Sequence, residues 1–371
     1  VTFIGILSEL VPSGILPQMT QGLGIEDTQV GFLVGIYALA SAIFAIPLIS
    51  MTLAVNRKTL LLILLAGFAL SNIVVGMSSS YYLIVAMRIL GGICAGIMWP
   101  MIGAYGAALV TEELQGRAIT IIMAGNTFGV SLGLPFMTYI GTHLGWRTEF
   151  ILLGALGALI ALVAAKFLPS VPGEKLTQSN SPIAMLKIPQ VWIVLVLTFL
   201  SVVAHYSTYT YITLLVETLD FQGGISLALL IFGIGSVISV VLSARVIDAH
   251  LRGLIVAMLA AGAVAMLLFV LFGGVNGWSH IAFLLWGLAF GPLVTMWQTA
   301  VSKQVTEAKA VATSVQSSVF NFSIMIATWV AGLILVYLPQ YGAMGIVYLS
   351  ILCFIPALLL SYFSKQTLGA K

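Results

Sequence analysis

Long apolar runs, repeated along almost the whole chain, are the feature that most constrains its fold. A helix that spans a bilayer needs about 20 mostly apolar residues. Polar or Gly/Pro-rich breaks separate twelve such runs: 1–17, 29–53, 59–78, 81–107, 118–141, 147–168, 190–217, 225–247, 253–273, 280–301, 310–337 and 342–363. The sequence therefore predicts an all-α integral membrane protein with twelve transmembrane helices. Because the first run begins at Val1 and is short, we expect helix 1 to be truncated at its start.

Composition excludes most other classes of protein. Of the 371 residues, 61% are hydrophobic and 7% are charged, whereas a soluble domain has about 25% charged residues. The sequence has no basic tract, no phosphate-binding loop and no His-Glu-x-x-His or Cys-x-x-Cys pattern. Nucleic-acid binding, ATP hydrolysis and metal-dependent catalysis therefore have no support. We expect a protein that is not an enzyme and has neither a cofactor nor a metal site.

The positive charges test the number of helices. Twelve spans that start in the cytoplasm place 12 of the 14 Lys and Arg residues on the cytoplasmic side, with Arg147 outside and Arg88 inside a helix. Basic residues concentrate in cytoplasmic loops. The charges therefore support twelve spans and two cytoplasmic termini.

The longest break, from Pro169 to Pro189, is rich in Pro, Ser, Lys and Glu. It predicts an N-terminal half, 1–168, and a C-terminal half, 190–371, with six helices each and a cytoplasmic linker, 169–189, between them. Transporters built from two pseudo-symmetric halves have this layout, with the substrate site near the midplane. The layout favours a transporter with a central cavity over a channel or an enzyme, and it leaves the substrate open.

Glu9 is the acidic residue that lies deepest in a predicted span. It precedes Pro17, where the first run ends, by eight residues, which is about 12 Å along a helix. Ionisable groups at such depth are costly and usually face water or a partner. We interpret Glu9 as the proton-binding group of a transporter.

Arg88 lies at nearly the same depth as Glu9. It follows Tyr81 by seven residues, or about 10 Å, and a buried cation also needs an acceptor or water. Gly92 and Gly96 follow it with the spacing that allows close approach of another helix. Glu9 and Arg88 are therefore expected to approach each other. Two interpretations stay open, a proton-linked pair and an ion pair that only joins two helices.

Taken together, these motifs resemble the major facilitator superfamily over the whole length of the chain. Arg88 with its following glycines is similar to the helix-4 motif that the superfamily associates with proton coupling, and Gly145-Trp146-Arg147 with Phe150 is similar to its entry into helix 6. Two further motifs resemble the bacterial branch of proton-coupled sugar, nucleoside and drug exporters, with arabinose-type sugar efflux transporters among its members: Glu9-x-x-Pro12-x-Gly14-x-Leu16-Pro17 and Ala204-His205-Tyr206-x-x-Tyr209-x-Tyr211.

The chain departs from the superfamily pattern in its cytoplasmic loops. Thr52 occupies the place of an aspartate before the basic pair Arg57 and Lys58, whereas the equivalent loop of the second half retains Asp248 and Arg252. The resemblance implies that these four residues form gating loops. An ionic latch is in doubt in the first half.

The fifth predicted helix also departs from the superfamily. It carries Gly125, Gly129 and Gly133, similar to the antiporter motif, but Val130 replaces the proline of that motif. Close helix packing and a mechanistic bend both stay open as explanations of these glycines. The direction of transport therefore depends on the resemblance.

The seventh predicted helix carries a polar arc. Thr198, Ser201, His205 and Tyr209 recur every three or four residues and share one face. His205 lies about 17 Å from the end of the span. A membrane histidine can be a hydrogen-bonded packing residue, or His205, Tyr206 and Tyr209 can bind a polyol or a flat ring. We take these three residues as the candidate substrate contacts.

Asn126 and Asn321 are also predicted to lie deep in the membrane, as is Asn72. We include Asn126 and Asn321 as weaker candidate substrate contacts, and hydrogen bonding between helices is the alternative for all three.

These observations lead to one hypothesis with alternatives. We expect a proton-coupled secondary transporter that exports small solutes by antiport. Because Arg88 is the only deep cation, an anionic solute would lack counter-charges, so we expect neutral or cationic solutes such as sugars or drugs. The resemblance implies a monomer in the bacterial cytoplasmic (inner) membrane, whose partners are protons, the small solute and the lipid bilayer. A proton symporter or facilitator for uptake is the first alternative. A solute-binding membrane receptor is an alternative of another class.

Overall fold

The computed structural model describes residues 1–52, 54–111, 115–173, 188–275, 277–305 and 309–364, together with Leu368. Every regular element in these residues is helical. The chain divides into two compact units, Val1–Gln178 and Ser179–Lys371, and each is treated by itself. The division falls within the predicted linker 169–189, of which residues 174–187 lie outside the described part of the chain.

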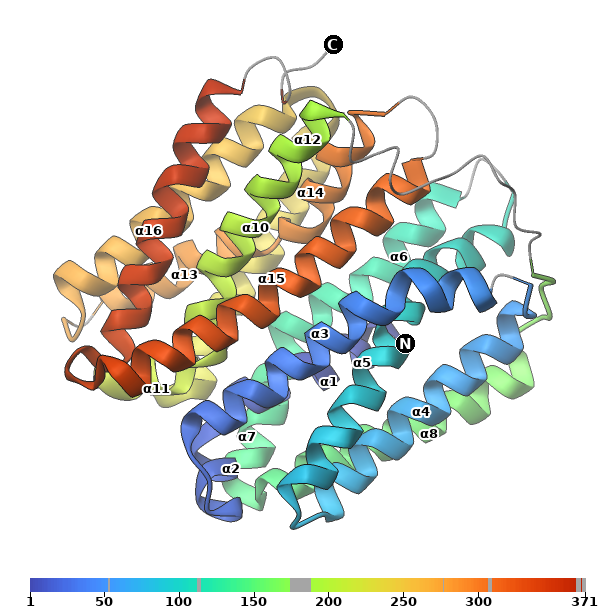
Figure 1. Cartoon of the computed structure of the whole chain (residues 1–371), viewed down its shortest axis with the longest axis horizontal. Coiled ribbons are helices and arrows are strands. Elements are labelled where there is room, and N and C mark those ends of the chain that lie inside the picture. The colour runs from blue at the N-terminus through green and yellow to red at the C-terminus, as the bar shows by residue number, and fades with distance from the viewer. Residues whose placement is uncertain are drawn as a thin grey trace. The chain divides into compact units, whose positions relative to one another are not determined.

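Unit 1 is a helical bundle in which α3 packs along α5 and α4 packs along α8 (Figure 1). Its elements are α1 (Thr2–Gly14), α2 (Leu16–Leu23), α3 (Asp27–Thr52), α4 (Arg57–Met77), α5 (Tyr81–Ala108), α6 (Gln115–Phe128), a π-helical turn (Gly129–Gly133), α7 (Leu134–Leu144) and α8 (Trp146–Phe167).

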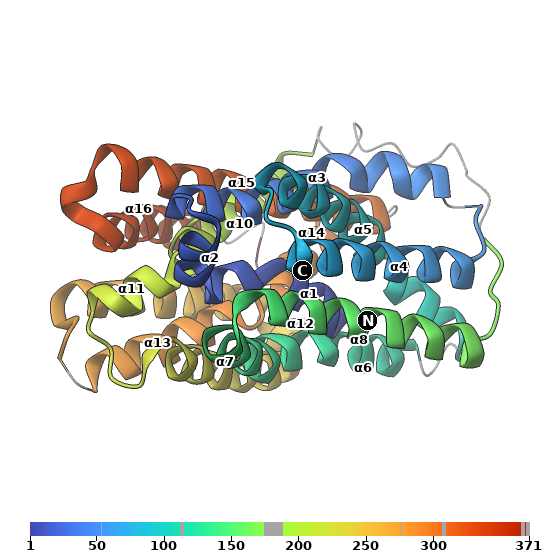
Figure 2. The same cartoon turned by 90° about the horizontal axis from the view of Figure 1, so that it is seen from below.

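Unit 2 is built around α10, which packs against both α15 and α16, while α12 packs against α13 and α16 (Figure 2). Its elements are α10 (Pro189–Thr210), α11 (Ile212–Thr218), α12 (Gly224–Phe272), α13 (Trp278–Phe290), α14 (Leu293–Ser302), α15 (Lys309–Tyr337), a 3-10 turn (Pro339–Tyr341) and α16 (Gly342–Phe363).

The described part of the chain contains 11 segments that are long and apolar enough to cross a membrane. The predicted span 1–17 is not among them, because α1 has 13 residues and ends where Ile15 leaves helical geometry (φ −128°, ψ 25°). Thirteen residues extend about 20 Å, less than the hydrocarbon thickness of about 30 Å. The twelfth span therefore stays a prediction.

Two more of the predicted helices are interrupted beside a proline. The predicted helix 118–141 contains the π-helical turn Gly129–Gly133, which ends two residues before Pro135. The predicted helix 280–301 is divided into α13 and α14 at Gly291–Pro292. Proline has no N–H to continue the helical ladder, and π-helical turns occur as single-turn bulges inside α-helices.

Two other differences from the predicted helices have no proline at the break. The predicted helix 190–217 ends at Tyr211 (φ −110°, ψ 28°) and restarts as α11. Conversely, the polar break predicted between 225–247 and 253–273 shrinks to one non-helical residue, His250 (φ −131°, ψ 39°), so that α12 is continuous around a kink.

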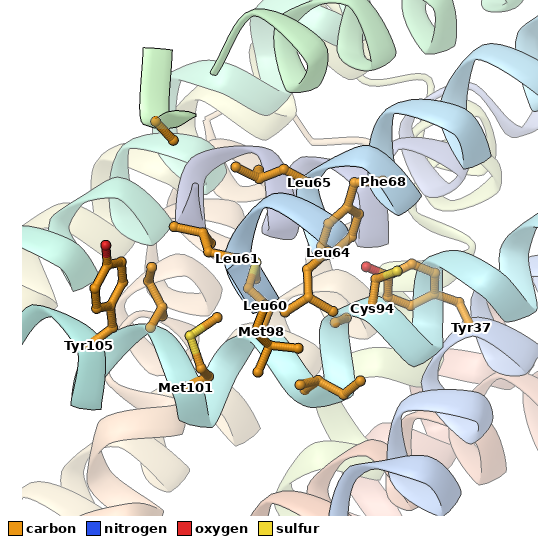
Figure 3. Close-up of a cluster of buried hydrophobic side chains, with 14 residues drawn as sticks. Tyr37, Leu60, Leu61, Leu64, Leu65, Phe68, Cys94, Met98, Met101 and Tyr105 are labelled. Atoms are coloured by element: carbon orange, nitrogen blue, oxygen red, sulfur yellow. The ribbon is translucent and has the colours of Figure 1, made fainter. Parts of the chain in front are cut away.

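The apolar core of unit 1 lies where α4 faces α5. Leu60, Leu61 and Leu64 of α4 lie opposite Met98 and Met101 of α5, as Figure 3 shows. This core fixes the α5 backbone that carries Arg88.

Candidate functional site

Arg88 is the centre of a buried polar network in unit 1. Its side chain is 2% exposed. The guanidinium donates from Nε to the Leu33 carbonyl (3.0 Å), from Nη2 to the Glu9 carbonyl (3.1 Å) and from Nη1 to the Ser8 carbonyl. It also lies 4.3 Å from the ring centroid of Tyr37. One side chain of α5 therefore joins α1 to α3.

Pro12 explains why a carbonyl of α1 is available to Arg88. In an α-helix the carbonyl of residue 8 accepts a hydrogen bond from the N–H of residue 12. Residue 12 is proline inside α1, and proline has no N–H. The Ser8 carbonyl, which lacks this helical donor, is one of the acceptors of the guanidinium. The charged donor thus replaces the missing helical one.

Glu9 lies within this network and is 5% exposed. Its charge interacts electrostatically with both Arg88 and Tyr37. The structure therefore brings Glu9 and Arg88 together, and the Glu9 backbone carbonyl accepts one hydrogen bond from the guanidinium. The coupling of this pair to protons stays a prediction.

Glycines of α5 determine how closely α3 approaches Arg88. A methyl group at Gly92 would collide with the Tyr37 carbonyl, and one at Gly96 would meet the Ser41 backbone. Glycine at both positions therefore lets the two backbones touch, which places Leu33 and Tyr37 of α3 within reach of the guanidinium.

Asn72 connects the same network to α4. Its amide donates to the Ser8 hydroxyl (2.6 Å) and to the Phe68 carbonyl (2.8 Å), and its side chain is 2% exposed. The structure thus places Asn72 as hydrogen-bonding glue between helices, one of the two predicted interpretations.

The glycines at 125, 129 and 133 form the surface on which α1 lies. Methyl groups there would collide with Thr2, Ile6 and Phe3, respectively. Close packing, one of the two predicted explanations, is present, because α1 lies directly on these glycines. The π-helical turn Gly129–Gly133 occurs at the same place, and a mechanistic bend stays a prediction.

In unit 2, His205 is a hydrogen-bonded member of an aromatic cluster. Its Nδ1 accepts a hydrogen bond from Trp286 Nε1 (3.0 Å). Its ring makes edge contacts with Phe290 (5.5 Å between centroids) and Phe354 (4.8 Å). The imidazole, which is 1% exposed, is held by α13 and α16.

Tyr206 and Tyr209 extend the aromatic cluster. The Tyr209 ring is stacked on Phe290 (5.6 Å, 18° between planes) and meets Phe232 at 5.3 Å. Tyr206 packs against Phe290 and against Phe320 of α15. Both tyrosines are buried, so all three predicted substrate residues of helix α10 lie together on one aromatic surface of unit 2.

The weaker candidates Asn126 and Asn321 are both half-buried. Asn321 donates to the Ser317 carbonyl of its own helix (2.9 Å), and Asn126 lies on α6. The Arg57 N–H donates to the Val171 carbonyl (2.9 Å), and the Lys58 N–H is capped by Asn56 (3.0 Å).

The predicted gating residues of the second half do not lie in a loop. Arg252 is in α12, two residues after the kink at His250. It donates to the Tyr362 carbonyl of α16 (2.6 Å). The side chain of Asp248 lies outside the described residues.

A separate cavity of about 370 Å³ opens in unit 1 between α1, α5 and α6. Its lining is mainly apolar and includes Phe3, Ile102, Tyr105 and Ile122, and the Tyr105 hydroxyl donates to the Pro169 carbonyl (2.6 Å). None of the predicted site residues lines it.

Glu149 is a buried carboxyl that was not predicted from its distance to the end of its span. It lies in the first turn of α8 and is 0% exposed. Because it lies so near the end of its span, a count of residues along the helix predicts that it is exposed at the membrane surface. The helical pattern offers a better signal, because Trp146, Phe150 and Leu153 at helical spacing form a buried face that includes it.

Comparison with known proteins agrees with the helical architecture. A family model described as Major Facilitator Superfamily matches residues 1–328. Three solved structures are similar over nearly the full length of both chains. A mutant of the nucleoside transporter NupG has a TM-score of 0.76 at 14% identity, covering 97% of this chain and 96% of that one.

The other two structures are comparably similar. A bacterial homolog of the human lysosomal transporter Spinster, in an inward-facing and occupied conformation, has a TM-score of 0.74 at 15% identity, covering 99% of this chain and 95% of that one. The human organic anion transporter MFSD10 has a TM-score of 0.70 at 16% identity, with 97% of each chain covered. At these identities the structures show a shared fold.

Proposed function

Because this chain belongs to the Major Facilitator Superfamily, and is a multi-pass membrane transporter and not an enzyme, we propose that it exports small neutral or cationic solutes in exchange for protons. The proposal extends to twelve spans in two pseudo-symmetric halves, 1–168 and 190–371, and to a monomer with cytoplasmic termini in a bacterial inner membrane. Sugars and drugs are the solute classes that we consider first.

The observation that carries the proposal is the environment of Glu9. This carboxyl is buried beside the guanidinium of Arg88 and the ring of Tyr37. Burial favours the neutral form of a carboxyl, whereas a nearby cation favours the charged form. These opposing effects allow a small rearrangement to change the proton affinity of Glu9, which is what a coupling group must do.

Arg88 acts in this proposal as a positioning residue for Glu9. Its three donors hold the backbone of α1 and α3 at Ser8, Glu9 and Leu33. Any movement of α1 relative to α5 changes these hydrogen bonds and the distance from the cation to the Glu9 carboxyl together. Proton binding and helix movement are coupled in this way.

The engagement of Arg88 also bears on the solute. The Arg88 guanidinium uses three of its five N–H donors on backbone carbonyls. It also lies over Tyr37 and is almost fully buried, which keeps an anionic solute from reaching it. This favours neutral or cationic solutes. The similar structures include a nucleoside transporter and an organic anion transporter, so the shared fold does not select the solute.

We assign solute contact to the aromatic cluster of unit 2. His205, Tyr206 and Tyr209 lie on one surface of α10, surrounded by Phe290 and Trp286. Ring faces bind flat or apolar groups, and phenol hydroxyls bind polar ones. In the described conformation these rings pack on each other, so a solute must replace ring–ring contacts when it binds.

Proton coupling is tested with Glu9→Gln in proteoliposomes that contain a pH-sensitive dye. Arabinose, uridine and ethidium are the probes, loaded inside or added outside. For the wild type we expect proton movement opposite to solute movement. Glu9→Gln should abolish proton-driven flux and retain solute binding, and Glu26→Gln, which changes an exposed carboxyl of the same unit, should leave both intact.

The outcomes separate the alternatives. Proton and solute movement in the same direction would identify a symporter, and solute movement without protons a facilitator. Binding of a probe without any flux would identify a receptor. If Glu9→Gln keeps wild-type driven flux, the proton site is elsewhere, with His205 next to be examined.

The solute contacts are tested with Tyr206 and Tyr209. If the hydroxyls bind a polyol, Tyr→Phe at either position should weaken binding by about 1–3 kcal/mol. If the rings stack on a flat solute, Tyr→Phe should be nearly silent and Tyr→Ala severe. Calorimetric affinities for the four variants distinguish the two cases. Unchanged binding by all four would remove this surface from the solute site.

A further inference from the structure

Glu149 is a second buried carboxyl of unit 1, and the proposed function does not use it. Its side chain is 0% exposed. Neither carboxyl oxygen has a hydrogen-bond or ion-pair partner among the described residues. This contrasts with Glu9, which lies in a network of donors and a cation.

The Glu149 carboxyl occupies a space left by a glycine of α7. A methyl group at Gly141 would overlap Glu149 Oε2 and would also collide with the Cγ2 atom of Ile15. The carboxyl of α8 and the side chain of Ile15 therefore meet over the Gly141 backbone. Ile15 is the residue at which the first helix breaks into α1 and α2.

Two hydroxyl groups lie along the same joint. Thr138, one turn before Gly141 on α7, packs against the backbone of Gly14. The Thr138 hydroxyl and the buried Ser13 hydroxyl have no hydrogen-bond partner among the described residues. The α1–α2 joint thus rests on a group of polar atoms whose hydrogen-bonding capacity is unused.

Among the described residues, no charge compensates Glu149 from the helices that pack most extensively on α8, which are α1, α4 and α7. The helix α2 also meets α8, where Gly22 lies against Trp146, and it carries no charged residue. On α7, His143 Nδ1 bonds to Thr142 and to the Tyr139 carbonyl at the exposed helix end. On α8 itself, Arg147 donates to the Ser78 carbonyl (3.2 Å). Arg88 is held by α1 and α3.

The charged groups of α1 and α4 are also placed elsewhere. Glu9 belongs to the Arg88 network. On α4, Gly76 packs against Ile151 of α8, whereas Arg57 and Lys58 begin the helix at its far end, about 27 Å away along the axis.

We propose that Glu149 is a second proton-binding carboxyl, which carries its proton while the α1–α2 joint packs on α7 and releases it to water when the joint moves away. A buried carboxylate without a partner is very costly, whereas the neutral acid costs far less. Ionisation therefore requires that water reach Glu149, and the nearest movable cover is the joint at Ile15. The inference depends on the packing of unit 1 and does not require that Glu9 couple transport.

The linkage has a defined sign. Since the closed joint favours the neutral acid, raising the pH favours the open joint. One proton released on opening shifts the equilibrium between closed and open by up to about tenfold per pH unit.

The first test reads the protonation state directly and needs no solute. Infrared spectra of the purified Glu9→Gln protein are compared with those of the Glu9→Gln, Glu149→Gln double variant. We expect the double variant to lack a protonated-carboxyl C=O band that persists at neutral pH in the single variant. Glu26→Gln serves as the exposed-carboxyl control and should leave that band in place. If replacing Glu149 removes no protonated-carboxyl band, the proposal is wrong.

The second test reads the joint. Ser13→Cys is introduced after replacing Cys94 and Cys353 with alanine, and labelling by a membrane-impermeant maleimide is followed against pH. The ratio of the labelling rates with and without Glu149→Gln cancels the titration of the thiol itself. We expect the labelling rate of the protein with Glu149 to depend on pH differently from that of the Glu149→Gln variant. In the variant, the equilibrium between closed and open joint should not respond to pH.

The outcomes of the labelling test are decisive in both directions. A ratio that changes with pH, up to about tenfold per unit, supports the proposal, and a constant ratio overturns it. If Na⁺ at constant pH changes the ratio and pH does not, the site binds a metal cation and the proton assignment is wrong. Thermal unfolding of Glu149→Gln checks folding, and Glu149→Leu, which also removes the acid, replaces it in both tests if that variant is unstable.

Discussion

Replacing Arg88 with methionine tests the physical basis of the polar network in unit 1. Methionine keeps an unbranched apolar side chain and removes every donor. The substitution leaves the carbonyls of Ser8, Glu9 and Leu33 without the guanidinium to which they now bond. Of these, the Ser8 carbonyl suffers most, since Pro12 cannot supply the helical N–H in its place.

The magnitude follows from the burial of the site. A hydrogen bond from a charged donor contributes about 1.5–3 kcal/mol, and a desolvated cation over an aromatic ring contributes about 2 kcal/mol. These terms are not additive, and removing Arg88 also removes its desolvation cost. Breaking a buried charged contact by deleting one partner typically costs about 3–5 kcal/mol. We expect Arg88→Met to destabilise unit 1 by that amount.

The assay is a double-mutant cycle with Pro12→Ala, measured by chemical unfolding in mixed detergent micelles. Alanine at position 12 restores an N–H that can bond to the Ser8 carbonyl. The cost of Arg88→Met should therefore fall by about 1 kcal/mol in the Pro12→Ala background.

Arg147→Met is the matched control for this cycle. Arg147 donates to the Ser78 carbonyl (3.2 Å) and lies over the Trp146 ring (4.2 Å), but its side chain is only half-buried. We expect a loss of at most about 1 kcal/mol, unaffected by Pro12→Ala. If Arg88→Met costs no more than this control, or if Pro12→Ala leaves its cost unchanged, the network does not hold α1 as argued.

Two further predictions concern helix contacts, both read from thermal unfolding midpoints. Gly92→Ala places a methyl group against the Tyr37 carbonyl and should destabilise the protein by about 1–3 kcal/mol. Its control is Gly103→Ala on the same helix, where the methyl group meets open space and should leave stability unchanged or raise it. The Thr208 and Ser350 hydroxyls lie 2.7 Å apart between α10 and α16; a cycle of Thr208→Val and Ser350→Ala should give a coupling of about 0.6 kcal/mol, and zero coupling would mean that the bond contributes no stability.

Sequence reasoning predicted the helical class and the family, both of which are confirmed. The length and apolar character of the runs determine helices almost by themselves. It also predicted that Glu9 and Arg88 approach each other. The hydrogen bond from Arg88 to the Ser8 carbonyl could have been predicted from Pro12, which lies four residues after Ser8 and has no N–H.

The breaks within helices were only partly predictable. Ile15 precedes Leu16-Pro17, and Gly291 precedes Pro292, so a proline marks both places. Tyr211 lies in a segment without proline or glycine, and tertiary packing of α11 on α12 and α16 is the remaining cause. Local sequence does not encode that packing.

Glu149 shows why depth alone is a poor guide to burial. Three residues into α8, it would be solvated if the helix ended at a free surface. Instead Gly141 of α7 offers no side chain at the contact, so α7 and the α1–α2 joint close over it. Burial here depends on a glycine eight residues earlier in another helix, which a count along one span does not register.

The first helix of each unit breaks with nearly the same backbone geometry, at Ile15 (φ −128°, ψ 25°) and at Tyr211 (φ −110°, ψ 28°). The side chains near the two breaks differ in chemistry. Before Ile15 stands Glu9 with a guanidinium, and before Tyr211 stand Tyr209 and His205 in a cluster of rings. A carboxyl beside a cation can exchange a proton, whereas rings and a hydrogen-bonded imidazole offer surfaces for a solute. This difference is the physical reason for assigning the proton to unit 1 and the solute to unit 2.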